Sequence, residues 1–424
     1  MITDMDMSRF ATHSLKDPRI IRILSASLEA VDPYKAVQKH LPTLLGRVFG
    51  LGIGKAAVPM MDALAARITL SGGLAVTKFT SGIHRESFAV IEGSHPVPDE
   101  RSLQAGKRVL EFVSALNEED TLVCLISGGG SALVTAPYVP LEDLQTLTSL
   151  LLASGARIDE INTLRRQLDH LKGGGLARAT KAKIASLILS DVIGNPLEAI
   201  ASGPTAPDPT TKTDALAILK KYDLESRVPD SILLFLNDED QVFQEQASRF
   251  QNVQNIIVGD NEFASQAALE QAEREGFYAE ILTNELQGEA RTVGRELAHR
   301  LRVDSTMKPR PFCLIAGGET TVTLRGNGKG GRNQEVALSA VSELRDLENV
   351  MLVSLGTDGD DGPTDAAGAV VTGETAQRAE LLGLDASDHL TRNDAYPFFD
   401  ALGDLLKTGP TGTNVNDLNF LFAI

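Results

Sequence analysis

The sequence has few cysteines and no long apolar run. Among its 424 residues are only two cysteines, Cys124 and Cys313, and both stand within apolar, strand-like stretches. We therefore expect two buried, reduced thiols, and not a disulfide, a zinc site or a nucleophile. No stretch reaches the roughly 18 apolar residues that a membrane-spanning helix requires, so we expect no membrane association.

The sequence also contains fewer basic than acidic residues. The chain carries 40 Lys and Arg against 57 Asp and Glu, which gives a net charge of −17. Nucleic acids and anionic membranes demand a positive face, so neither is expected as a partner. Any anionic ligand must be held by a local group of cations. The first residues, MITDMDMSRF, lack the charged-then-apolar order of a signal peptide, and we expect a soluble, cytoplasmic protein.

Length predicts two domains, since 424 residues exceed the usual size of a single core. The pattern is interrupted between Leu236 and Asn255, where an acidic stretch precedes a polar, Gln-rich one. We therefore place the domains at residues 1–240 and 255–424, with an N-terminal helix packed on the second domain. Loops with candidate ligand-binding residues occur in both halves, so a ligand cleft with contributions from both domains is expected.

Six apolar runs end in small, charged or hydroxyl residues. Helical patterns separate most of these runs, which predicts an α/β protein with mainly parallel strands. In such sheets, ligands bind beyond the carboxyl ends of the strands. The six runs are residues 47–51, 122–126, 186–189, 256–258, 313–316 and 352–355, and the helical patterns include residues 17–45, 56–67, 141–152, 263–275 and 336–344.

A glycine-rich turn directly follows the run at residues 122–126. Its five residues combine N–H groups that can approach a ligand closely with two hydroxyls, which is a suitable arrangement for binding phosphate oxygens. A tight turn that needs glycine for steric reasons is the alternative. The GxSxG pattern of a hydrolase nucleophile is absent. The turn consists of Ser127, Gly128, Gly129, Gly130 and Ser131.

A second glycine-rich loop follows the run at residues 313–316, after an alternating stretch at 320–324 that resembles a further strand. Its glycines surround Lys329 and precede Arg332, so together they suggest an anion cradle. A long hairpin loop with solvated cations is the alternative. The glycines are Gly326, Gly328, Gly330 and Gly331.

Lys55 and Asp191 each stand just beyond a predicted strand. The lysine could neutralise a phosphoryl group and the carboxylate suits a general base or a magnesium ligand, while a surface lysine and a loop cap are the plain alternatives. Asp358 opens a loop with four carboxylates, but Ala369 stands where a calcium loop needs glutamate, which leaves magnesium–nucleotide binding or a solvated loop. His95 is interpreted as a structural histidine in a proline-containing loop.

A dinucleotide fingerprint is only weakly matched. Residues 52–57 fit the loose GxGxxA form, but the acidic residue expected about 20 positions later is missing from residues 74–79. The phosphate-loop pattern GxxxxGK[ST] fails because Ala56 follows Lys55.

Taken together, several blocks resemble the glycerate 2-kinase family, whose members carry a C-terminal MOFRL domain and were formerly often labelled hydroxypyruvate reductases. The resemblance covers nearly the whole chain. The blocks are GLGIGKAA (50–57), GSHPVPDE (93–100), ISGGGSAL (126–133), LKGGGLA (171–177), LSDVIGNPLEAIASGPTAPDPTT (189–211), AGGETTVTLRGNGKGGRNQE (316–335), GTDGDDGPTDAAGAVV (356–371) and GPTGTNVNDL (409–418).

The resemblance implies a Rossmann-like α/β/α domain followed by an α/β MOFRL domain, with the active site in the cleft between them. It implies transfer of the ATP γ-phosphoryl group to the 2-hydroxyl of D-glycerate, with magnesium, and leaves a homodimer open. Two positions depart from the family pattern, since Asn195 and Asp169 stand where aspartate and serine are common. Asn195 is therefore left out of the metal ligands.

Residue roles follow from the same comparison and from the chemistry of phosphoryl transfer. We expect Lys55, Asp191 and Arg332 to be catalytic, and Asp191 and Asp358 to bind magnesium. A nicotinamide-dependent hydroxypyruvate reductase and a non-catalytic nucleotide-sensing module are the competing hypotheses. The nucleotide-binding set is Ser127, Gly128, Gly129, Gly130, Ser131, Glu319, Gly328, Lys329, Gly330 and Asn333.

Overall fold

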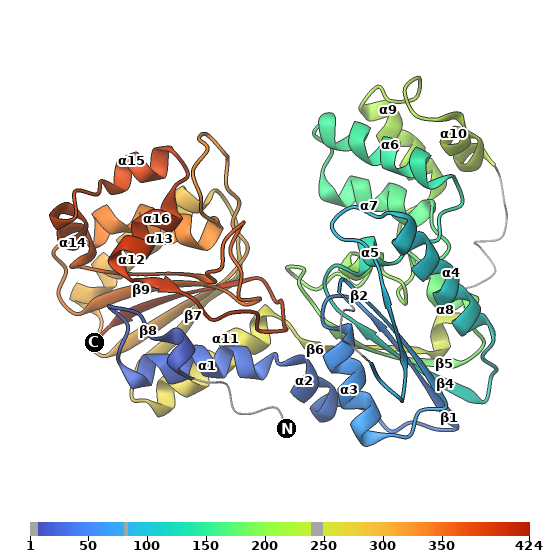
Figure 1. The fold of residues 1–424 in the computed structure, drawn as a ribbon, viewed down its shortest axis with the longest axis horizontal. Coiled ribbons are helices and arrows are strands. Elements are labelled where there is room, and N and C mark those ends of the chain that lie inside the picture. Colours follow the sequence, from blue (N-terminus) through green and yellow to red (C-terminus); the bar gives the residue numbers. More distant parts are fainter. Residues whose placement is uncertain (1–6, 80–83, 239–248) are drawn as a thin grey trace. The chain divides into compact units, whose positions relative to one another are not determined.

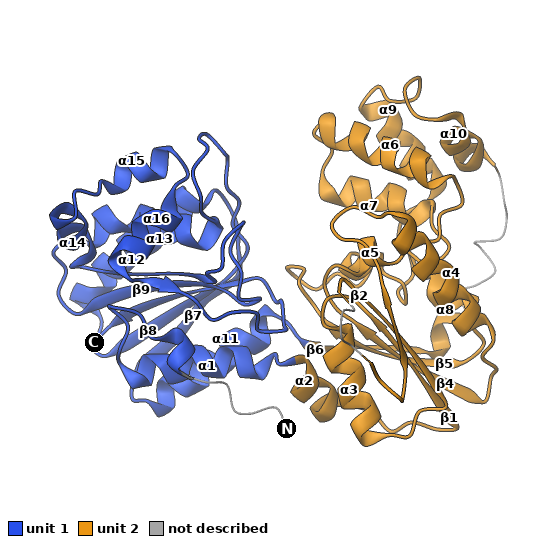
Figure 2. Ribbon diagram, in the orientation of Figure 1, with its two compact units in different colours: residues 1–32, 259–424 blue, residues 33–258 orange. Residues whose placement is uncertain are grey.

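A computed structural model describes residues 7–79, 84–238 and 249–424 (Figure 1). The chain forms two compact units (Figure 2): unit 1 combines Met1–Asp32 with Gly259–Ile424, and unit 2 is Pro33–Val258. These bounds differ from the predicted domains 1–240 and 255–424 in two respects. The boundary lies at the end of strand β6 (Val253–Gly259), which joins the first sheet, and residues 1–32, assigned to the first predicted domain, belong to unit 1 with the C-terminal half of the chain. The expected packing of an N-terminal helix on the C-terminal half agrees with this division.

Unit 2 contains a six-stranded sheet in the order β3-β2-β1-β4-β5-β6. Adjacent strands from β3 to β5 are all parallel. The order is that of a doubly wound Rossmann sheet, whose direction of winding reverses between β1 and β4. The strands are β1 (Arg47–Ile53), β2 (Gly72–Thr77), β3 (Ala89–Glu92), β4 (Asp120–Ile126), β5 (Lys183–Leu189) and β6 (Val253–Gly259).

The helices of unit 2 fall into two groups. Those of the first group cover the sheet, whose buried strands supply one apolar core. The first group is α2 (Pro33–His40), α3 (Ala57–Arg67), α4 (Glu100–Ser114), α5 (Gly130–Leu133) and α8 (Gly175–Ala179). Those of the second group pack on one another around a separate apolar core, and Figure 1 shows them together at one end of the unit. The second group is α6 (Leu141–Ala153), α7 (Ile158–Gln167), α9 (Lys212–Lys221) and α10 (Asp230–Asn237), and a short 3₁₀ helix, η2 (Ile200–Ser202), follows β5.

Unit 1 also contains a six-stranded sheet, in the order β11-β10-β9-β12-β8-β7. Only β7 and β8 pair in parallel, whereas the other four pairs are antiparallel. The prediction of mainly parallel strands is therefore wrong for this unit. The strands are β7 (Tyr278–Leu286), β8 (Phe312–Gly318), β9 (Val350–Gly356), β10 (Gly368–Thr372), β11 (Leu405–Leu406) and β12 (Asp417–Ala423).

The late strand β12 explains this difference. It inserts antiparallel between β8 and β9, so those two strands still run in the same direction and end at the same edge of the sheet. Asp417, the first residue of β12, pairs with Gly318 on one side and with Gly356 on the other. The strand-end loops of β8 and β9 therefore meet around the start of β12.

Helices cover both faces of this second sheet, as Figure 1 shows for α12 and α13 on one side and for α1 and α11 on the other. The helix α1 packs along α11 within unit 1. None of the helices in the described ranges is long and apolar enough to cross a bilayer. The helices are η1 (Met7–Phe10), α1 (Pro18–Ala30), α11 (Asn261–Arg274), α12 (Ala290–Met307), α13 (Arg332–Leu344), α14 (Thr375–Leu381), α15 (Ala386–Thr391) and α16 (Ala395–Leu402).

The six predicted runs all form strands, and the α/β class is confirmed in both units. The predicted strand at residues 320–324 is wrong. That stretch makes only an isolated bridge from Thr321 to Glu289, and Leu324 is 78% exposed. Val322 packs against the core of this unit, but among the described residues the stretch has no neighbouring strand with which to form a ladder. Cys124 and Cys313 are free and buried, as predicted, and burial raises the pKa of the Cys124 thiol to about 12.

Candidate functional site

In unit 2, the predicted residues gather where the winding of the sheet reverses. Lys55 follows β1 and the Ser127–Ser131 turn follows β4, and these two strands are neighbours throughout their length. Backbone hydrogen bonds join the two loops, since Lys55 N–H donates to the Gly128 carbonyl over 3.0 Å. The crevice outside such strand ends is the usual ligand position in this fold. The structure therefore brings two sequence-predicted elements together.

Glycines in this turn are required by their neighbours. A Cβ on Gly128 would lie 2.1 Å from Oδ2 of Asp191, and one on Gly129 would lie 3.1 Å from the His95 ring and 3.4 Å from Cγ of Lys55. Gly129 also has a φ of 83°, which favours glycine. Lys55 and Asp191 thus approach two consecutive glycines. The loops after β1, β4 and β5 meet here with the loop that carries His95. We therefore treat this strand-end cluster as the candidate active site of unit 2.

The cluster includes two residues that were not predicted as site residues. Burial lowers the pKa of His95, and the nearby ammonium groups of Lys55 and Lys78 lower it further. Lys78 directly follows β2. A cation at a third strand end is a signal in the sequence for an anion site, and Lys78 supplies it within residues 74–79, where an acidic residue is missing.

The two serines of the turn have structural contacts. Ser127 is 2% exposed, and its hydroxyl accepts a hydrogen bond from Ala56 N–H over 3.0 Å. The Ser131 hydroxyl lies 2.7 Å from that of Ser202 on η2. Ser127 therefore ties the β4 loop to the β1 loop, while Ser131 ties it to the long loop that follows β5. Asp191 lies at the start of that same loop.

In unit 1, the charged residues gather at the edge where β8 and β9 end. Arg332, the first residue of α13, forms a bidentate ion pair with Asp417 at 2.6 and 3.0 Å and a second pair with Glu319 at 2.7 Å. Its side chain is 34% exposed, whereas that of Asp417 is 4% exposed. Burial raises the pKa of Asp417, which Arg332 partly offsets. The predicted residues Glu319 and Arg332 are therefore brought together, and Asp417 was missed.

Asp417 had a readable signal, because it begins the apolar stretch DLNFLFA near the end of the chain. Burial would lower the pKa of Arg332, but the hydrogen bonds that it donates to Asp417 and the nearby carboxylates of Asp417, Glu319 and Asp361 outweigh that effect and raise the pKa. Arg332 is thus a fixed, permanently charged group that is partly exposed.

A second missed carboxylate lies at the N-terminus of α13. Asp361 is 3% exposed and accepts hydrogen bonds from Asn333 N–H at 3.0 Å and from Gln334 N–H at 2.8 Å. Burial raises its pKa to about 7, against the effect of these bonds. The Asn333 side chain is also buried, and it accepts a hydrogen bond from Ser354 over 2.8 Å. This geometry favours a structural role for Asn333.

The glycine-rich loop before α13 packs on the turn between α15 and α16. Its N–H groups at Gly328 and Lys329 donate to the Arg392 carbonyl at 3.0 Å and to Asp394 Oδ1 at 2.9 Å. A Cβ on Gly328 would lie 2.5 Å from that of Asp394. These glycines are therefore explained by close packing, and the part of the loop at Gly328 and Lys329 does not present free N–H groups as an anion cradle. Gly330 packs less tightly, with a Cβ 3.2 Å from Ala395.

The Lys329 ammonium lies over the Tyr396 ring, 4.0 Å from its centroid, and the residue is exposed. Asp358 is partly buried after β9, and its carboxylate accepts a hydrogen bond from Asp360 N–H over 3.2 Å. Its backbone carbonyl accepts a further bond from Thr411 N–H. Asp358 thus stands at the same edge of the sheet as Glu319 and Arg332.

Within the described ranges, no three His, Cys, Asp or Glu side chains form a ready-made metal site. Magnesium commonly binds through one or two carboxylates together with substrate phosphates and water, so such a site need not be preassembled. Asp191 and Asp358, each partly buried at a strand end, are suitable single ligands of that kind.

The strand-end clusters define an α/β protein whose two units each gather cations and carboxylates at strand ends. Comparison with known proteins identifies the family. Residues 19–237 match the domain of unknown function DUF4147, and residues 312–417 match the MOFRL family.

The D-glycerate 2-kinase of Thermotoga maritima is 45% identical in an alignment of 412 residues that covers 94% of this chain and 96% of that protein. The glycerate 2-kinase of Pyrococcus horikoshii is 41% identical over 94% of this chain and 95% of its own length. The crystal structure of the Thermotoga maritima glycerate kinase matches with a TM-score of 0.90 and covers 96% of this chain and 99% of its own. This chain belongs to the glycerate 2-kinase family.

Proposed function

We propose that this protein transfers the γ-phosphoryl group of ATP to the 2-hydroxyl of D-glycerate, which gives 2-phospho-D-glycerate and ADP. The observation that carries the proposal is the 45% identity to a D-glycerate 2-kinase over 94% of the chain. The strand-end cluster of unit 2 supports it, because a lysine and a carboxylate meet there at a glycine turn. Phosphoryl transfer depends mainly on positioning and charge compensation, which these groups can supply.

Asp191 would orient the 2-hydroxyl and accept its proton as the hydroxyl oxygen attacks the γ-phosphorus. The bond from that phosphorus to the β,γ-bridging oxygen breaks, and ADP leaves with the electron pair. The ammonium of Lys55 would compensate charge on the transferring group. The loops around Ser127–Ser131 and Gly330 would contact nucleotide phosphates.

Arg332 would also compensate charge on the transferring group, from a guanidinium already fixed by Asp417 and Glu319. We also propose that Glu319 binds the nucleotide. Its carboxylate pairs with Arg332 and can leave that ion pair to bind a group of the ligand. Magnesium would be held by Asp191 or Asp358 and would neutralise charge on the phosphates. A cytoplasmic location and a homodimer remain proposals, the former in keeping with two buried, free thiols.

The reductase hypothesis has less support. In a dinucleotide fold, a carboxylate near the end of the second strand binds the ribose. In this chain β2 ends at Thr77 and Lys78 follows, so a cation stands where that carboxylate is expected. Absence of NADH oxidation with hydroxypyruvate would complete the exclusion.

The decisive experiment is a magnesium- and ATP-dependent assay on D-glycerate, with enolase added to consume the product. Enolase accepts 2-phosphoglycerate directly, so conversion without a mutase would establish both the kinase activity and the 2-position. ATP consumption without enolase turnover would refute the 2-position. No ATP consumption with D-glycerate would refute the proposed function, and ATP binding without turnover across hydroxy acids would then favour a nucleotide-sensing module.

A further inference from the structure

Two consecutive arginines on α7 have opposite environments. Arg166 is 7% exposed and is paired with Asp208 over 2.8 Å, with a further bond to the Glu198 carbonyl at 3.4 Å. Arg165 is also partly buried, but no carboxylate or other acceptor contacts its guanidinium among the residues that the structure describes. Burial lowers the pKa of Arg165 without any opposing carboxylate. The fold therefore retains a desolvated cation that it does not neutralise.

Such a group carries a free-energy cost, because a charge removed from water is normally paired. The neighbouring Arg166 shows that this helix can place a guanidinium against a carboxylate. An unneutralised arginine is a good receptor for an anion from outside, since its planar guanidinium matches a carboxylate in bidentate fashion.

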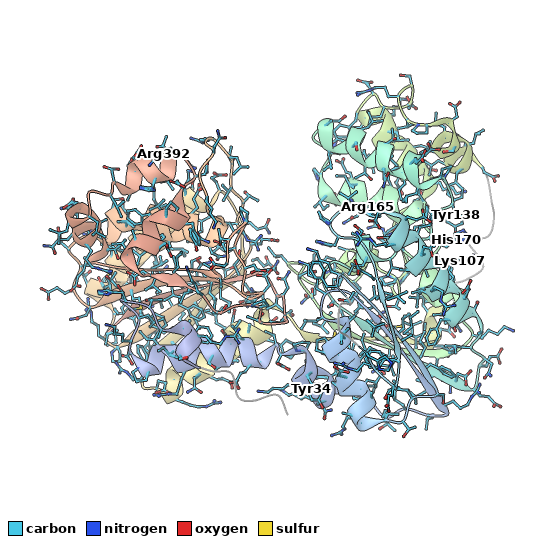
Figure 3. All side chains as sticks on the ribbon, in the orientation of Figure 1. Tyr34, Lys107, Tyr138, Arg165, His170 and Arg392 are labelled. Carbon is cyan, nitrogen blue, oxygen red and sulfur yellow. The ribbon has the colours of Figure 1, made fainter. Side chains whose placement is uncertain are left out.

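The position of α7 connects Arg165 to the candidate active site. Helix α7 packs against η2, and η2 packs against α5, which begins in the Ser127–Ser131 turn. Figure 3 shows Arg165 on the side of α7 that is turned toward α5. Two hydrogen bonds hold the β5–η2 segment, one from Arg166 to the Glu198 carbonyl in the loop and one from Gly173 N–H to the Ser202 carbonyl of η2 at 2.9 Å.

The same loop begins at Asp191, which we propose orients the acceptor hydroxyl. In a 2-hydroxy acid, the carboxyl carbon is bonded directly to the carbon that carries this hydroxyl. A carboxylate-binding group must therefore lie close to the hydroxyl-orienting group. Helix α7 packs on η2, at the end of the loop that begins at Asp191, and this position favours the acceptor as the ligand of Arg165.

We propose that Arg165 binds the carboxylate of the 2-hydroxy acid acceptor and thereby selects acids over neutral polyols. The inference rests on the proposed function. The guanidinium of Arg165 positions the substrate and takes no part in proton or phosphoryl transfer. Binding of the acceptor also supplies a counter-ion that no described residue provides at this position.

The test compares Arg165→Met and Arg165→Lys with the wild-type enzyme. Loss of a charge-assisted, bidentate contact should raise the KM for D-glycerate by at least about 30-fold in Arg165→Met, with the KM for ATP changed less than about twofold. Arg165→Lys retains the positive charge but loses the bidentate geometry of the guanidinium, so it should give an intermediate KM for D-glycerate. Glycerol, which lacks the carboxylate, should be phosphorylated equally poorly by all three.

Arg157→Met is the matched control, since Arg157 lies at the start of the same helix in an exposed ion pair with Asp159. It should leave both KM values unchanged. Thermal unfolding of each variant would verify that the helix is intact. If wild-type enzyme fails to phosphorylate D-glycerate, the proposed function is refuted and this inference falls with it. If the wild type is active but Arg165→Met retains its KM for D-glycerate, or raises only the KM for ATP, this inference alone is refuted.

Discussion

Gly128 and Asp191 lie in such close contact that no side chain fits between them, because a Cβ on Gly128 would be 2.1 Å from Oδ2 of the carboxylate. Gly128 follows β4 and Asp191 follows β5, and these strands pair in parallel. The glycine is thus required by a side chain on the neighbouring strand end. This contact fixes the proposed base against the proposed nucleotide-binding turn.

We expect Gly128→Ala to displace the Asp191 carboxylate, since a contact of this length cannot be tolerated. A displacement of about 1 Å at a reacting group lowers turnover about 100-fold, so kcat should fall by that order. Steady-state kinetics on D-glycerate would measure the effect. Gly72→Ala is the control, because its Cβ would meet only aromatic side chains, the Phe49 ring at 3.2 Å and the Phe112 ring at 3.7 Å, at the other end of the strands. Unchanged kcat in Gly128→Ala would show that the position of Asp191 is not critical.

Removal of the Lys55 ammonium should affect turnover more than binding. If Lys55 compensates charge chiefly in the transition state, Lys55→Met should lower kcat by about 100- to 1,000-fold with a much smaller change in KM. Lys183→Met, an exposed residue at the start of β5, should retain full activity. A large rise in KM at normal kcat would instead assign Lys55 to ground-state binding.

Asp361 should make stability depend on pH. Its pKa of about 7 in the folded protein exceeds the ordinary value of 3.8 because the carboxyl is buried. Between these values the folded state retains a proton that the unfolded state releases, so the free energy of unfolding should fall as pH rises, by at most about 1.4 kcal/mol per pH unit. The contribution is complete below the lower value and is lost as pH passes the upper one.

Asp361→Asn should remove this decline, and urea unfolding at about pH 5 and pH 8 would measure it. Asp360→Asn provides the control, because Asp360 is an exposed residue of the same loop. Equal pH dependence of the free energy of unfolding in the wild type and in Asp361→Asn would contradict a raised pKa at this position.

The buried pair of Asp169 and Lys172 should be necessary for the stability of unit 2. Their side chains are 1% and 6% exposed, with 2.6 Å between Nζ and Oδ2. Asp169→Ala would leave a buried, unpaired ammonium and should cost about 3–5 kcal/mol of unfolding free energy. Asp169→Ala with Lys172→Met should recover part of that loss. Urea denaturation would measure both variants.

The exposed pair of Arg108 and Glu111 serves as a reference, since its side chains are 66% and 50% exposed. Glu111→Ala should cost less than about 1 kcal/mol. If Asp169→Ala were as mild as Glu111→Ala, the buried pair would contribute no more than a surface pair. Asp169 replaces a residue that is commonly serine in this family, and the structure gives the replacement a partner in Lys172.

The sequence by itself determined the features that depend on local order along the chain. Six apolar runs form strands, and Lys55, Asp191 and the Ser127–Ser131 turn all follow strand ends. These predictions succeeded because a strand and the turn after it are specified by neighbouring residues: burial selects apolar side chains, and a sharp turn selects glycine. The ordered blocks along the chain also identified the family.

Only the tertiary structure decided which strand ends meet. The order of the first sheet places β4 beside β1, although β2, β3 and α4 lie between them in the chain. Insertion of β12 between β8 and β9 brings Asp417 to Arg332, and it makes the second sheet largely antiparallel. Strand pairing is a contact between distant segments, so no local pattern specifies it. For the same reason, the unpaired state of Arg165 and the packing of the Gly328 loop could be recognised only once their neighbours were in place.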